Sequence, residues 1–121
     1  MIPVSWGELL DKIAILEIKT HRLRTGQARA NALRELTLLR RIAADLPGVV
    51  ELRAAMLAVN TRLWRIEDLI REKEAAGDFG RGFVALARAV YLENDERGRI
   101  KRAINRVLCS ALVEEKQYSA Y

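Results

Sequence analysis

The chain has 121 residues, of which half are hydrophobic and 31% are charged, so it suits one globular domain and is too apolar for a disordered protein. Its formal net charge of +5 mildly favours anionic partners. A single cysteine and a single histidine exclude an internal disulfide, a cysteine-rich zinc site and a multi-histidine site, so we expect neither a metal nor a cofactor.

Hydropathy also limits the location of the protein. No hydrophobic run approaches the roughly 18 residues that cross a bilayer, and the first residues lack the basic and apolar regions of a secretory signal. The lone cysteine is compatible with a reducing compartment. We therefore expect no membrane span and a cytoplasmic location.

Hydrophobic residues recur at helical spacing through most of the chain. Ser5 and Glu8 form a capping-box pattern at the start of the first helix, and glycine or proline marks breaks at residues 25–27, 46–48 and 77–80. The predicted helices cover residues 6–24, 29–45, 50–75 and 82–109. The sequence thus predicts an all-α fold, a single domain over residues 1–121, built as a bundle of about four helices with a short C-terminal tail.

The first predicted helix is apolar on two sides. Trp6, Leu9 and Leu16 belong to one apolar arc, whereas Ile15 and Ile18 lie on the other side of the helix. Two apolar flanks are typical of a helix that is central to a bundle or held at an oligomer interface.

Polar residues on or beside apolar faces are the main candidates for function. The last predicted helix places Asn94, Arg97, Lys101 and Asn105 next to its core face, and the third aligns four residues at 4-3-4 spacing along one side. The first helix adds a carboxylate inside its apolar arc and a lysine on a neighbouring strip. We predict a ligand-binding site from these side chains: Lys12, Glu17, Asn60, Trp64, Glu67, Arg71, Asn94, Arg97, Lys101 and Asn105.

Two arrangements of these groups are open. In one, carboxylates and cations pair in a closed network that fixes the helix register, because unpaired buried cations are very unfavourable. In the other, cations outnumber carboxylates and an anionic ligand completes the site. Arg71, Arg97 and Lys101 would then bind phosphate or carboxylate oxygens, and Trp64 would form an apolar wall.

Other patterns are weaker. His21 is best explained as a helix residue near a C-terminus, and adjacent acid pairs such as Asp95 and Glu96 point to different helix faces rather than to one magnesium site. The last helix carries a basic stripe, but no aromatic residue interleaves it, and we do not expect nucleic acid as a partner. The stripe consists of Arg88, Arg99, Arg102 and Arg106.

Motifs spread over nearly the whole chain resemble those of an uncharacterised bacterial family, catalogued as a domain of unknown function. They lie at residues 4–13, 15–19, 59–60, 63–64, 66–68, 70–71, 86–88, 90–91, 94–95, 97, 100–101, 104–105, 114–116 and 118. The resemblance implies a bacterial cytoplasmic protein, sometimes encoded beside surface-polysaccharide genes. A looser, architectural likeness links the chain to the all-helical chorismate mutases, but their motif spacing is not matched here.

Three functional hypotheses follow. The first is binding of an anionic small molecule, of the sugar phosphate or nucleotide sugar class, at a polar site inside the bundle, as an accessory to surface-polysaccharide synthesis. The second is a protein-interaction or homo-oligomeric adaptor whose buried salt bridges are structural. The third is a small all-α enzyme in which Glu67 or Glu17 is the general acid or base, although no catalytic signature supports it.

Overall fold

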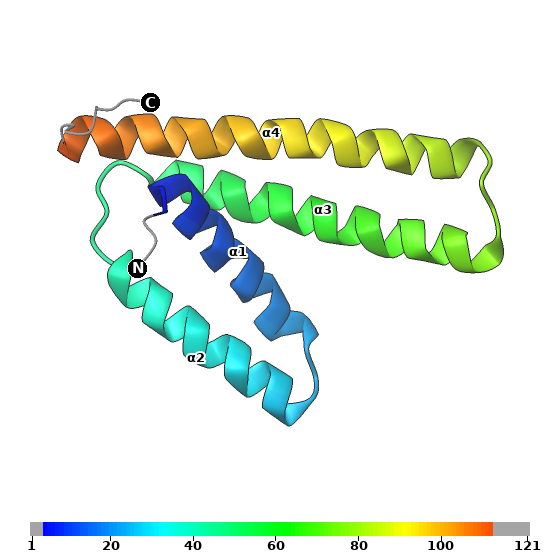
Figure 1. Ribbon diagram of the computed structural model, residues 1–121, viewed down its shortest axis with the longest axis horizontal. Coiled ribbons are helices and arrows are strands. Elements are labelled where there is room, and N and C mark those ends of the chain that lie inside the picture. The colour runs from blue at the N-terminus through cyan, green and yellow to red at the C-terminus, as the bar shows by residue number, and fades with distance from the viewer. Residues whose placement is uncertain (1–3, 113–121) are drawn as a thin grey trace.

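The computed structural model describes residues 4–112, and over that range it consists of four α-helices (Figure 1). They are α1 (Trp6–Arg22), α2 (Gly26–Ile42), α3 (Val50–Ala76) and α4 (Arg81–Leu112). The prediction of an all-α bundle of about four helices is confirmed. Residue 110, where we predicted the tail to begin, still belongs to α4, and the rest of the predicted tail, residues 113–121, lies outside the described residues.

Local chemistry explains where α1 begins and α3 ends. The Ser5 hydroxyl accepts a hydrogen bond from the Glu8 N–H at 3.1 Å, which confirms the predicted cap. At the other junction Gly77 has φ 67°, a left-handed conformation that suits glycine after a helix, and its N–H donates to the Glu74 carbonyl. The Ser5 cap and the left-handed Gly77, both at positions that the sequence marks, thus set the start of α1 and the end of α3.

Helix α1 is the central helix of the bundle. It packs against α2, α3 and α4, whereas α2 contacts α1 alone among the four described helices. Ile18, on the second apolar side of α1, is buried, and Ile15 is half-buried. The two apolar sides are therefore covered from within the chain, as expected for a central helix.

Helices α3 and α4 form a long antiparallel hairpin that reaches past the other two helices (Figure 1). The hydrophobic core lies only at the end where α1 crosses this hairpin. Its side chains on the hairpin come from Met56 and Val59 of α3 and from Ile100, Ile104 and Leu108 of α4. We call the remaining part the arm, defined as residues 69–76 of α3, the connecting turn and residues 81–92 of α4; no residue of the arm is buried.

Within residues 4–112, none of the helices combines the length and the hydropathy that spanning a bilayer requires.

Candidate functional site: a buried ion cluster between α1, α3 and α4

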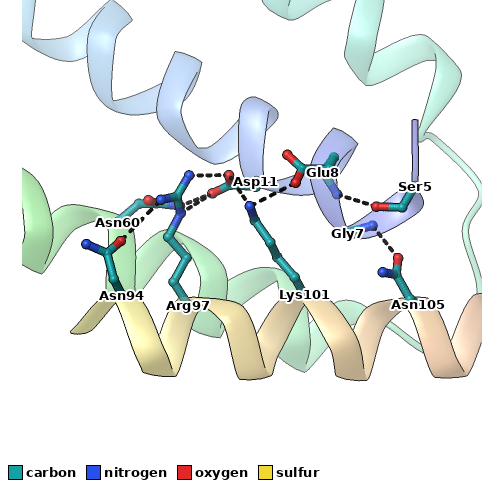
Figure 2. A network of polar contacts seen from close by, with 9 residues as sticks. All are labelled: Ser5, Gly7, Glu8, Asp11, Asn60, Asn94, Arg97, Lys101 and Asn105. Atoms are coloured by element: carbon teal, nitrogen blue, oxygen red, sulfur yellow. Dashed lines mark hydrogen bonds and ion pairs between the residues drawn. The ribbon is translucent and has the colours of Figure 1, made fainter. Parts of the chain in front are cut away.

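The carboxylate of Asp11 lies at the point where three helices meet (Figure 2). It is 3% exposed. Its Oδ1 accepts hydrogen bonds from Asn60 Nδ2 at 2.9 Å and from Arg97 Nε at 2.9 Å, and its Oδ2 accepts from Arg97 Nη2. Lys101 Nζ lies 3.3 Å from the same Oδ2. One carboxylate from α1 therefore holds an amide from α3 and two cations from α4.

Further polar contacts extend from this centre toward the surface. Lys101 Nζ donates to Glu8 Oε2 at 3.1 Å, and Arg97 Nη1 donates to Asn94 Oδ1 at 3.3 Å. Together these groups form what we call the Asp11 cluster: Glu8, Asp11, Asn60, Asn94, Arg97 and Lys101. One turn along α4, the Asn105 side-chain oxygen accepts the Gly7 N–H at 2.8 Å (Figure 2).

Helical spacing places the cluster residues. Glu8 and Asp11 are three residues apart on α1, and Arg97 and Lys101 are four apart on α4, so each pair lies on one face. Gly7 allows the two helices to come this close, because a Cβ atom there would lie 2.7 Å from the Lys101 carbonyl oxygen. The start of α1 therefore rests directly on the backbone of α4.

Formal charges in the cluster balance. Glu8 and Asp11 supply two negative charges, and Arg97 and Lys101 supply two positive charges, with contacts that pair each cation with a carboxylate. The excess of cations that belongs to the second arrangement is not found in this cluster, because Arg71 contacts Asp68 instead. A charge-balanced cluster around a buried carboxylate agrees with the first of the two arrangements, in which carboxylates and cations pair with one another.

The protonation state of the centre follows from these contacts. Burial raises the pKa of Asp11, but the hydrogen bonds from Arg97 and Asn60 and the charges of Arg97 and Lys101 outweigh burial and hold it below its ordinary value. The hydrogen bond to Asp11 likewise raises the pKa of Arg97. Asp11 is thus an ionised acceptor near neutral pH and has no proton to donate as a general acid.

The structure brings four of the ten predicted site residues into the cluster, namely Asn60, Asn94, Arg97 and Lys101, and a fifth, Asn105, lies beside it. The other five lie elsewhere on the molecule. Lys12 pairs with Glu35 at 3.0 Å, Glu17 pairs with Arg40 at 2.9 Å, and Arg71 contacts Asp68 at 3.3 Å. Trp64 packs under the Arg22 guanidinium, 5.9 Å from the ring centroid, and Glu67 is exposed.

The direction of α1 is the physical reason for this separation. Helix α1 starts against α4 and then runs away from the hairpin (Figure 1). Beyond Asn60, the long Arg22 side chain of α1 reaches Asp68 of α3 at 3.2 Å. The predicted polar residues of α3 therefore continue at regular helical spacing beyond the level at which α1 turns away from the hairpin.

Asp11, the centre of the cluster, was missed. It lies one heptad before Ile18, on the second apolar side of α1. A carboxylate on that side of a helix with two apolar flanks was the signal that could have identified it. Among the described residues, no group of three or more metal-binding acidic, histidine or cysteine side chains comes together.

Fold and cluster together define an all-helical protein in which a charge-balanced ion cluster around the buried Asp11 carboxylate joins three packed helices. Comparison of the sequence with protein families identifies the chain as a member of a family of unknown function, DUF6165, whose profile matches residues 1–121. No curated protein and no solved structure matches the chain.

Proposed function

We propose that this protein is an interaction protein: its arm binds a second copy of the same chain, and its Asp11 cluster holds the helices in register. The observation that carries the proposal is the uncovered apolar surface of the arm. Val84, Tyr91 and Leu92 of α4 are 52%, 68% and 60% exposed, and Phe79 in the connecting turn is also exposed.

The arm has an incomplete core. Ile70 and Phe83 remain half-buried, because only two helices are present in the arm. An isolated helical hairpin cannot cover its apolar residues on all sides, and a second copy packed against it removes part of that surface from water. Each square ångström of apolar surface removed from water contributes about 25 cal/mol, so association of two arms is the favourable way to cover this surface.

Other apolar surfaces are less suited to this role. The two apolar sides of α1 are already covered by its own chain. Leu38 and Ile42 on the outer side of α2 are exposed, but they alternate with exposed polar residues such as Arg34, Thr37 and Arg41. In the arm, by contrast, Phe83, Val84, Ala87, Tyr91 and Leu92 line one hollow together with Arg88.

Sedimentation velocity over a wide concentration range tests the proposal. We expect a reversible shift from a 13.7 kDa monomer to a dimer as the concentration rises. Tyr91→Glu should move the equilibrium toward the monomer. Leu38→Glu is the matched control, because Leu38 is similarly exposed at 57% but lies on α2, and it should leave the equilibrium unchanged. A chain that stays monomeric at all concentrations, or a dimer lost only with Leu38→Glu, would contradict the proposal.

The predicted binding of an anionic small molecule is a second candidate, favoured by the open side of the Asp11 cluster. The side chains of Arg97 and Lys101 are 27% and 23% exposed, and Asn94 beside them is exposed. A sugar phosphate or nucleotide sugar would compete with Glu8 for Lys101. Such a ligand would fit an accessory role in surface-polysaccharide synthesis.

A thermal-shift series with sugar phosphates and nucleotide sugars tests this candidate, because a ligand that binds only the folded state raises its Tm. Lys101→Met should reduce the rise, and Arg71→Met, which changes an exposed cation outside the cluster, should not. No change in Tm with any compound would count against anion binding. The enzyme hypothesis has less support, since Glu17 pairs with Arg40 and Glu67 is exposed outside the Asp11 cluster.

A further inference from the structure

We infer that the two arms pack through α4 in an antiparallel manner, around a two-fold axis beside Tyr91. The inference rests on the proposed self-association and adds its geometry. It rests on a row of outward-facing α4 residues. When the rows of two copies lie side by side in opposite directions, the apolar, charged and small side chains of one copy face complementary side chains of the other.

The row follows the spacing of a helix seam. Val84, Arg88, Tyr91, Asp95 and Gly98 are separated by 4, 3, 4 and 3 residues, the pattern by which one helix presents a continuous line to another. All but the last are exposed, and Gly98 is half-buried. The row lies beside the α4 face that contacts α1 through Arg97 and Lys101, so a second helix can approach it without displacing α1.

Charge selects the antiparallel direction. In a parallel pair Arg88 would lie opposite its own copy, and so would Asp95, which places like charges together. In an antiparallel pair centred at Tyr91, Arg88 of each copy lies within one residue of the position opposite Asp95 of the other, close enough for two ion pairs. The exposed Tyr91 and Leu92 side chains then meet at the centre, where apolar contact contributes most.

Gly98 provides a separate indication. Glycine inside a helix costs up to about 1 kcal/mol relative to alanine, and within the chain a Cβ there would meet only the Arg102 side chain, at 3.4 Å. The space above Gly98 is thus not used by its own fold. In the antiparallel arrangement Val84 of the second copy lies over it, so that a side chain on one helix faces a gap on the other.

The extent of the contact limits its strength. Beyond Gly98, Arg102 of one copy would approach Arg81 of the other, so the contact is confined to residues 84–98 of each α4. Fifteen residues of helix are about 22 Å long, which is short for a stable interface and typical of a reversible one. We therefore expect a dimer that dissociates on dilution.

Charge reversal tests the pairing in the intact chain. Arg88→Glu and Asp95→Arg should each raise the dimer Kd by at least about fivefold, because each change turns two attractive pairs into two repulsive ones. The double variant, with both changes, should recover most of the original Kd. Arg106→Glu is the matched control on the same helix outside the seam and should have a much smaller effect.

Disulfide trapping tests the direction independently, with Cys109→Ser as the background in every variant. Tyr91→Cys should link two copies, Val84→Cys alone should not, and a mixture of Val84→Cys with Gly98→Cys should give the mixed dimer. Efficient linking by Val84→Cys alone, or a double charge variant that remains as weak as the single ones, would overturn the antiparallel seam while the protein still dimerises. Absence of any dimer would instead overturn the proposed function.

Discussion

The carboxylate of Asp11 accepts hydrogen bonds from α3 and α4 while belonging to α1, and it does so as a charged group with almost no contact with water. Removing one member of a buried ion pair leaves the others uncompensated, with losses of about 3–5 kcal/mol in comparable cases. A single side chain thus links the packing of three helices. Its ionisation should be visible in the stability of the whole protein.

Acid unfolding measures that contribution. Because the pKa of Asp11 is lower in the folded state than in the unfolded chain, the unfolded state binds more protons as the pH falls. The stabilisation is therefore fully present above the ordinary aspartate pKa of about 3.9, and it is lost as the pH falls through the lower, folded-state value. In urea titrations between pH 2.5 and 6, Asp11→Asn should be less stable at pH 6 and should lose less stability on acidification.

Two exposed carboxylates, Asp78 and Glu96, also have lowered pKa values, through hydrogen bonds to Lys73 and Arg99. Both remain in Asp11→Asn, so the difference between the two proteins reports on Asp11. An identical pH dependence for the two proteins would show that Asp11 is not stabilised as an ion in the cluster.

Gly7 governs how closely α1 approaches α4. Alanine is the better helix former by up to about 1 kcal/mol, yet a Cβ at Gly7 would meet the Lys101 carbonyl and the Asn105 oxygen at 2.7 and 3.1 Å. We expect Gly7→Ala to lower Tm despite the gain in propensity. Gly26→Ala is the control: it lies in the first turn of α2, nothing is within 4 Å of its Cβ position, and its Tm should not fall. An unchanged Tm for Gly7→Ala would show that the helices are not in close contact.

At the scale of the helices, capping offers a direct comparison. Ser5 caps α1 with a side-chain hydrogen bond, whereas Thr25, at the equivalent position of α2, makes none. Loss of a capping side chain typically lowers stability by about 1 kcal/mol. Ser5→Ala should therefore destabilise the protein by that amount in urea titrations, and Thr25→Ala should have a clearly smaller effect. Equal losses would argue against the cap.

Helix positions could be predicted because hydrophobic periodicity and capping residues are local. The four observed helices match the predicted ranges to within three residues at every end. The largest differences concern α2 and α4. Gly26 was read as part of a break, but it begins α2 because Thr25 is extended and Gly26 is already helical, and α4 continues through residue 112.

The candidate site could be predicted only in part. The row from Asn94 to Asn105 was identified because one helix's own spacing brings its residues to one face. The residues beyond Asn60 on α3 were assigned wrongly to the same site, since the angle at which α1 leaves α3 depends on packing between helices and not on the spacing within either one. Asp11 was missed because its partners are on helices far away in the sequence.

At the scale of the whole molecule, the hydrophobic core and the arm are separate parts of the structure. The end where α1 crosses the hairpin contains the hydrophobic core and the Asp11 cluster, and the arm contributes neither. Substitutions at the surface of the arm should therefore alter association with little effect on the fold of the monomer. Self-association and the antiparallel contact can thus be tested without a change in the stability of the monomer. Membership of DUF6165 extends over both parts of the chain.

The long sequence distance between Asp11 and Arg97, 86 residues, has a consequence for biosynthesis. Ribosomes extend a chain by about 5–20 residues per second, so Arg97 emerges roughly 4–17 s after Asp11. During that interval the nascent chain carries an aspartate destined for burial whose cationic partners have not yet been made. The contact of Asp11 with α4 can therefore form only after the part of α4 that carries Arg97 has left the exit tunnel.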